Sequence, residues 1–75
     1  NPSVNSINIT ELDVPQNTMV GCSLLNAAGQ MVRRESMPWN GKATLSIADF
    51  TPGMYLLVIH NDQGNVIHQQ SIIKQ

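Results

Sequence analysis

The chain has 75 residues, of which four are basic and five are acidic, and its formal net charge is −1. This length predicts one domain over residues 1–75, near the size at which folding buries only about 60% of the exposable surface. The single cysteine, Cys22, excludes an intrachain disulfide, and the balanced charge argues against binding to nucleic acid or to an anionic membrane.

Two strands are predicted in the first third of the chain, because apolar residues there alternate with polar or small ones. The first strand contains Ile7 and Ile9. A turn at residues 15–17 separates it from the second strand, at residues 19–26. The apolar face of the second strand consists of Val20, Cys22 and Leu24. We therefore expect Cys22 to be an inert core thiol rather than a reactive one.

A hairpin connects the second strand to a third. Residues 27–29 form a three-residue loop in which Gly29 supplies the positive φ, and the third strand covers residues 30–36. The charge cluster of this strand consists of Arg33, Arg34 and Glu35. We interpret the cluster as a solvated strand face, with contact to a receptor as the alternative.

Residues 37–42 contain proline, asparagine and glycine and are predicted to form a loop, and a fourth strand follows at residues 43–47. The loop carries Trp39, for which two roles remain open. An indole on an exposed loop stacks on a sugar or anchors a protein partner. An indole that packs over the end of a sandwich instead fills a core that has few large side chains.

The next segment predicts a turn and then a buried strand. Pro52 and Gly53 suit the two central positions of a type II turn. Tyr55 opens the fifth strand, at residues 55–60. At such a corner a tyrosine buries its ring and returns its hydroxyl to the backbone a few residues upstream. Because this strand is apolar on both faces, we place it in the middle of a sheet.

A second hairpin leads to the end of the chain. Its turn covers residues 61–64 with Gly64, and the last strand covers residues 65–74. A loop of two or four residues places His60 and His68 on opposite faces of the sheet, and a loop of three or five residues places them on one face. No third ligand has suitable spacing in either case, so no metal or cofactor is expected.

Neither catalysis nor membrane insertion is predicted. Asp49 and Asp62 lie in turns, where carboxylates bond to nearby backbone amides, and no serine and histidine are placed as a nucleophile and its base. The longest apolar run, residues 54–59, is far shorter than the roughly 20 residues of a membrane-spanning helix. We expect a soluble piece that is not an enzyme, and Asn1 does not open a signal peptide.

The alternation and the short turns together predict an all-β fold. No segment keeps a helical period for three turns, so helix is expected to be nearly absent. The expected architecture is a small antiparallel β-sandwich of about six to seven strands, immunoglobulin-like, with Greek-key connections.

Several short motifs follow one another along the whole chain. They are Asn1-Pro2, Ile7-Asn8-Ile9, the strand and glycine turn of residues 23–32, Phe50-Thr51-Pro52-Gly53-Met54-Tyr55, Gly64 and Ile72-Ile73-Lys74-Gln75. In this order the sequence resembles the C-terminal sorting domain of the type IX, or Por, secretion system of gram-negative bacteria. It departs from that family in having Phe50 where leucine is more frequent and in having Lys74 as its only basic residue after Lys42.

The resemblance implies a sorting function. Such domains are recognised by the outer-membrane translocon and direct the attached protein through the periplasm to the outer membrane, the cell surface or the medium. In most members a surface sortase then removes the domain, whereas some components of the machinery retain theirs. The implied partners are the type IX translocon, the sortase and attachment proteins, and an N-terminal cargo domain.

We expect recognition at the terminal strand. The candidate residues are Ile72, Ile73, Lys74 and Gln75. The residues expected to maintain turn and corner geometry are Gly29, Pro52, Gly53, Tyr55 and Gly64. Residues 66–75 contain one charge, so this strand is suited to pairing with a receptor or, by edge pairing or exchange, with a second copy in a homodimer. The alternative is that the strand is sealed inside its own sheet.

A fibronectin-like or carbohydrate-binding accessory module of a larger secreted protein is the alternative function. A seven-stranded module of that kind usually needs about 90 to 100 residues. A sugar binder also exposes two or more aromatic side chains together, and here only Trp39 is well placed. Both features favour the sorting function.

Overall fold

A computed structural model of the protein describes residues 6–75, so the Asn1-Pro2 motif lies outside the described residues. The strands are β1 (Ser6–Ile9), β2 (Met19–Asn26), β3 (Met31–Pro38), β4 (Ala43–Ser46), β5 (Gly53–His60) and β6 (Val66–Lys74). Over the described range the chain contains no helix that is long and apolar enough to cross a membrane.

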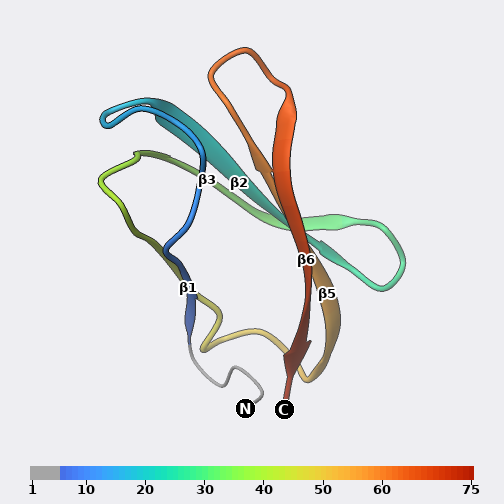
Figure 1. Cartoon of the computed structure of the whole chain (residues 1–75). Helices are drawn as coiled ribbons and strands as arrows, with labels where there is room; N and C mark the ends of the chain where they lie inside the picture. The colour runs from blue at the N-terminus through green and yellow to red at the C-terminus, as the bar shows by residue number, and fades with distance from the viewer. Residues whose placement is uncertain (1–5) are drawn as a thin grey trace.

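The strands form two antiparallel sheets that pack on each other as a sandwich (Figure 1). β1 pairs with β4, and the larger sheet has the strand order β3-β2-β5-β6. The chain changes sheets between β1 and β2, between β3 and β4, and again between β4 and β5. The predicted all-β sandwich is therefore confirmed, and so is the central place of the fifth strand, because β5 lies between β2 and β6.

The core lies between the two sheets and is built by alternation along the strands. We call the face of the larger sheet that packs on β1 and β4 its inner face. The inner-face residues that are no more than 1% exposed are Val20, Cys22, Leu24, Leu57 and Ile59. The smaller sheet covers them with Ile7, Ile9, Ala43 and Leu45. Because successive strand residues point to opposite faces, the residues between them form the outer face of the larger sheet.

Both hairpins of the larger sheet have the same kind of loop. Asn26 precedes the predicted three-residue loop, which is confirmed, and Gly29 ends it with a φ of 83°. Asn61 and Gly64 hold the same places in the second loop, with the same φ at the glycine. In each loop the asparagine side-chain oxygen accepts hydrogen bonds from the backbone amides two and four residues later. The repeated Asn-x-x-Gly spacing is the sequence signal of both loops.

A β-bulge in each hairpin shifts the register next to the loop. In the second hairpin Ile59 pairs with His68. The next pair is His60 with Val66, which leaves Ile67 as the extra residue. A three-residue loop alone would place the two histidines on one face, and the extra residue reverses this register. His60 and His68 therefore lie on opposite faces of the sheet.

The corner before β5 is held by Tyr55. Its hydroxyl donates to the Thr51 carbonyl at 2.6 Å, as predicted, and its ring is buried with the Phe50 ring centroid 5.2 Å away. The predicted type II turn is wrong. Within residues 6–75 no Met54 amide bonds to the Thr51 carbonyl, which receives the tyrosine hydroxyl instead. Gly53 has a φ of 150°, not the value of about 80° that this turn requires, and it is already the first residue of β5.

Trp39 closes one end of the sandwich. β3 continues through Pro38, beyond the predicted end of the strand, and Trp39 follows it. The Trp39 amide donates to the Thr18 carbonyl at 2.9 Å, and its carbonyl accepts from the Asn17 amide at 2.8 Å. The indole is 4% exposed and belongs to the core. Of the two roles open for Trp39, the structure shows packing.

Replacing Gly53 tests the strain at the corner. Gly53→Val places a β-branched residue at a φ of 150°, a conformation that is essentially restricted to glycine, so we expect a loss of about 1 to 3 kcal/mol in the free energy of unfolding. Gly21→Val is the matched control, because Gly21 lies in the same sheet without a positive φ and with no atom within 4 Å of an added Cβ. Urea unfolding measures both variants. Equal losses would contradict the assignment of strain to Gly53.

The buried thiol predicts a loss of stability at alkaline pH. Burial, and to a smaller extent the Glu35 carboxylate, raises the pKa of the Cys22 thiol. Above the unfolded thiol pKa of about 8.5 the unfolded state loses this proton while the folded state retains it, so the folded state loses stability as the pH rises. We expect the urea midpoint of the wild type to fall more steeply between pH 8 and about 10 than that of Cys22→Ala. Parallel curves would show that Cys22 contributes nothing to this dependence.

Candidate functional site

The predicted recognition residues lie on or directly after β6, an edge strand of the larger sheet. Ile72 is buried in the core, and Lys74 is only 8% exposed. Ile73 is 55% exposed, and Gln75 is exposed as well. Because alternate residues of a strand point to opposite faces, the structure brings two of these side chains to the surface and withdraws the other two from it.

Arg33 closes one side of the sandwich, between β3 and β4. Its guanidinium donates to the Ser46 carbonyl at 2.7 Å and to the Asp49 carboxylate at 3.4 Å. It also lies 3.7 Å from the Glu35 carboxylate and 5.0 Å from the centroid of the Phe50 ring. The predicted solvated face is therefore wrong for Arg33, because this side chain bridges the two sheets. The sequence contains no local signal for this bridge, since Ser46 lies on β4 and Asp49 and Phe50 lie in the segment that follows it.

The opposite side of the sandwich, between β1 and β6, is lined by polar groups. A shallow depression of about 180 Å³ there is lined by Asn8, Ile9, Thr10, Glu11, His68 and Gln70. His68 Nε2 and Gln70 Oε1 are 2.8 Å apart, so these two inner-face side chains bond to each other at the margin of the core. The β6 edge therefore lies beside polar side chains, which can remain in contact with water.

The two edge strands of the larger sheet differ in their resistance to pairing with another chain. β3 carries features that discourage such pairing: Arg33, Arg34, Glu35 and Pro38. β6 is nine residues long, and its one charged side chain, Lys74, is buried. Among residues 6–75 β6 pairs only with β5, so no second described strand lies along its other edge, and Lys74 at the end of β6 has a partner of its own.

The titratable groups do not converge on a reaction site. In residues 6–75 no group of three or more histidine, cysteine or acidic residues is arranged to hold a metal ion. Asp49 pairs with Arg33 rather than with a backbone amide, which corrects the expectation for this carboxylate. The backbone amides of the second hairpin bond to the Asn61 side chain, and Asp62 makes no hydrogen bond within the described range. The prediction that the aspartates bond to turn amides is therefore wrong.

The aromatic side chains form no platform for a sugar. The sequence has three aromatic residues, and two of them, Trp39 and Tyr55, are buried. Phe50 is partly exposed, but the Arg33 guanidinium and the Tyr55 ring lie against it. Nothing in this arrangement favours the carbohydrate-binding alternative.

Comparison with known proteins identifies the family. A family model described as a secretion system C-terminal sorting domain matches residues 1–74. Searches of curated proteins and of solved structures give no match. Members of this family are the signals that the type IX secretion system uses to export proteins across the outer membrane to the cell surface or the medium. Since the match covers nearly all of the sequence and the fold is the small β-sandwich described above, the chain belongs to the type IX secretion C-terminal sorting domains.

Proposed function

We propose that this sorting domain acts by recognition alone, without catalysis, and that the type IX translocon reads it by adding a strand to the edge of β6. The domain directs an attached protein to the cell surface or the medium. In this proposal residues 1–75 form a single domain, the cargo lies on its N-terminal side, and a surface sortase with its attachment proteins acts after export.

The difference between the two edge strands is the observation that carries the proposal. Strand addition supplies affinity through backbone hydrogen bonds and specificity through side chains at alternate positions. The charges and the proline of β3 oppose such pairing, whereas β6 has none of these features along its exposed positions. Ile73 and Gln75 are the side chains at its end that a receptor can contact, and Ile72 and Lys74 keep the strand attached to its own sheet.

Two further proposals concern the same strand. Recognition at the chain end acts through all four candidates, Ile72, Ile73, Lys74 and Gln75, of which the buried pair has a positioning role. The same edge also suits a second copy of this chain, so a homodimer formed by edge pairing or strand exchange competes with receptor binding. The turn and corner residues Gly29, Pro52, Gly53, Tyr55 and Gly64 act indirectly, because they set the course of the strands on which β6 depends.

Two matched substitutions test the β6 edge. Ile73→Lys adds a charge to β6, and Val32→Lys adds the same charge to β3, where the side chain is 44% exposed compared with 55% for Ile73. The 75 residues are fused behind a reporter in a bacterium that has the type IX machinery, and surface delivery is measured by protease accessibility. We expect Ile73→Lys to lower delivery about tenfold, which corresponds to about 1.4 kcal/mol in pairing, and Val32→Lys to leave it unchanged.

Folding and oligomeric state provide the controls. Circular dichroism establishes that both variants are folded, and sedimentation at several concentrations measures dimer formation. Equal surface delivery of the two variants would contradict recognition of the β6 edge by the translocon. Deletion of residues 71–75 is a weaker test, because Ile72 is a core residue and its loss unfolds the sheet together with any signal.

A further inference from the structure

The outer face of the larger sheet carries most of the large exposed apolar side chains of residues 6–75. Seven large apolar side chains of residues 6–75 are exposed, and all of them lie on this sheet. The strand register places six of the seven on the outer face: Met19, Met31, Met54, Leu56, Val66 and Ile73. By register four of them, Met31, Met54, Leu56 and Ile73, lie toward one end of this face, and Met19 and Val66 lie toward the other. Exposed apolar surface marks interaction sites, and methionine adapts its shape to a partner.

Gly21 lies in this face, and no feature of the domain itself requires glycine at this position. It is the one glycine of five whose φ is not positive, and an added Cβ would meet no atom within 4 Å. A glycine in the middle of a strand weakens that strand and often marks a place where another molecule approaches closely. Neither backbone conformation nor internal packing requires glycine here, so the space above Gly21 is available to something outside the domain.

Two polar groups next to Gly21 have unused hydrogen-bonding capacity. Ser23 is 3% exposed, and within residues 6–75 its hydroxyl makes no hydrogen bond. Since this part of the chain has no enclosed side-chain oxygen or nitrogen without a partner, the hydroxyl must open toward the surface. Arg34 pairs with Ser23 across the strands, and its guanidinium makes no hydrogen bond or ion pair in the same range.

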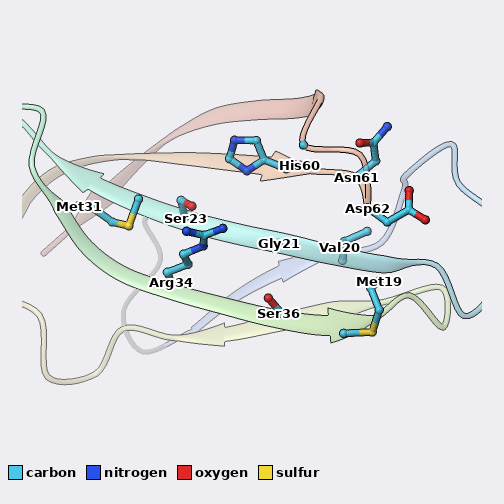
Figure 2. A pocket seen from close by; sticks show the side chains of 11 residues that line it. Met19, Val20, Gly21, Ser23, Met31, Arg34, Ser36, His60, Asn61 and Asp62 are labelled. Carbon is cyan, nitrogen blue, oxygen red and sulfur yellow. The ribbon is translucent and has the colours of Figure 1, made fainter.

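These residues surround one depression of about 540 Å³ (Figure 2). Gly21 and Ser23 form part of its floor, with Arg34 on the β3 side and His60 on the β5 side. Met19 and Met31 lie at its two ends, so the polar floor has an apolar rim. Asp62 lies near the Met19 end, and Arg34 lies nearer to Ser23 (Figure 2).

We propose that this depression is a docking site for a segment of another protein that presents an apolar side chain beside a carboxylate. The apolar side chain covers Gly21 between the methionines, and the carboxylate accepts hydrogen bonds from the Arg34 guanidinium and the Ser23 hydroxyl. Arginine and methionine are both enriched at the centres of protein interfaces. The site lies on a sheet face and not on the β6 edge, so it does not depend on the proposed mode of export.

Charge complementarity favours a foreign partner over a second copy. The outer-facing positions of the four strands contain one full charge, Arg34, and no carboxylate, because the one acidic strand residue, Glu35, lies on the inner face. Two outer faces packed together would therefore supply no strand carboxylate to Arg34. The one carboxylate at the depression, Asp62, belongs to the loop between β5 and β6 and lies at the Met19 end, away from Ser23 and Arg34 (Figure 2). A partner with an acidic residue next to an apolar one supplies it.

Two small probes that differ only in charge test the site. N-acetylphenylalanine has an apolar ring and a carboxylate, and N-acetylphenylalaninamide has the same ring without the charge. Each is titrated into the ¹⁵N-labelled chain, and amide chemical shifts are followed by NMR. We expect saturable shifts at the amides of Gly21, Ser23 and His60, with tighter binding of the charged probe.

Three variants separate the contributions. Gly21→Val fills the depression without backbone strain and should abolish the binding of both probes. Arg34→Gln should weaken the binding of the charged probe about two- to fivefold, the range of a partly exposed ion pair, and leave the binding of the neutral probe unchanged. Lys42→Gln removes a charge outside the depression and should change neither. Thermal unfolding verifies that each variant is folded.

Three results would overturn the proposal. The first is the absence of saturable shifts at these amides. The second is that both probes bind to Gly21→Val as tightly as to the wild type. The third is a concentration-dependent dimer of the wild type, measured by sedimentation, that Gly21→Val abolishes, because a second copy would then occupy the face.

Discussion

The smaller sheet has two short strands and has to cover one face of a four-stranded sheet. This difference in width determines which side chains lie at the margins of the domain. Neighbouring strands lie about 4.8 Å apart, so β1 and β4 can cover only the middle of the larger sheet. In the larger sheet the fully buried aliphatic side chains accordingly belong to the inner strands β2 and β5. The edge strands β3 and β6 turn Arg33, His68 and Gln70 toward the margin of the core, where water or a hydrogen bond satisfies them.

The limited core explains why single side chains close the sandwich at its boundaries. Arg33 joins β3 to β4 through the Ser46 carbonyl, Trp39 covers one end of the core, and Tyr55 holds the corner before β5. The Arg33 and Tyr55 side chains each donate to a backbone carbonyl, and all three side chains exclude water from the aliphatic centre. The total free energy of unfolding of a domain is only about 5 to 15 kcal/mol, so the loss of one boundary residue removes a considerable fraction of it.

The same arrangement leaves the backbone edge of β6 and the outer face of the larger sheet available for recognition. With no disulfide, no metal cluster among residues 6–75 and few charges, the domain presents a strand edge at β6 and an apolar outer face. Both are properties of a folded sheet and are absent from an unfolded chain. In the proposed mode of recognition, the translocon therefore recognises the folded shape of the sorting domain.

Local patterns predicted the strands well, because a strand with one buried face shows its alternation directly in the sequence. The faces of β2, the loop at residues 27–29 and the hydroxyl bond of Tyr55 all follow from residues close together in the chain. The turn at Gly53 was predicted incorrectly because Pro-Gly fits several bends, and the competing use of the Thr51 carbonyl is not visible in a dipeptide.

The sequence by itself determined the strand content, the hairpins and the family, since these depend on periodicity and on motif order. The tertiary structure alone decided three other features: the bulge that separates His60 from His68, the burial of Lys74 on β6, and the depression over Gly21. The physical reason is that each depends on register between strands or on side chains brought together from different strands. A shift of one residue in register moves a side chain from the core to the surface, and only the packed sheets select between the two.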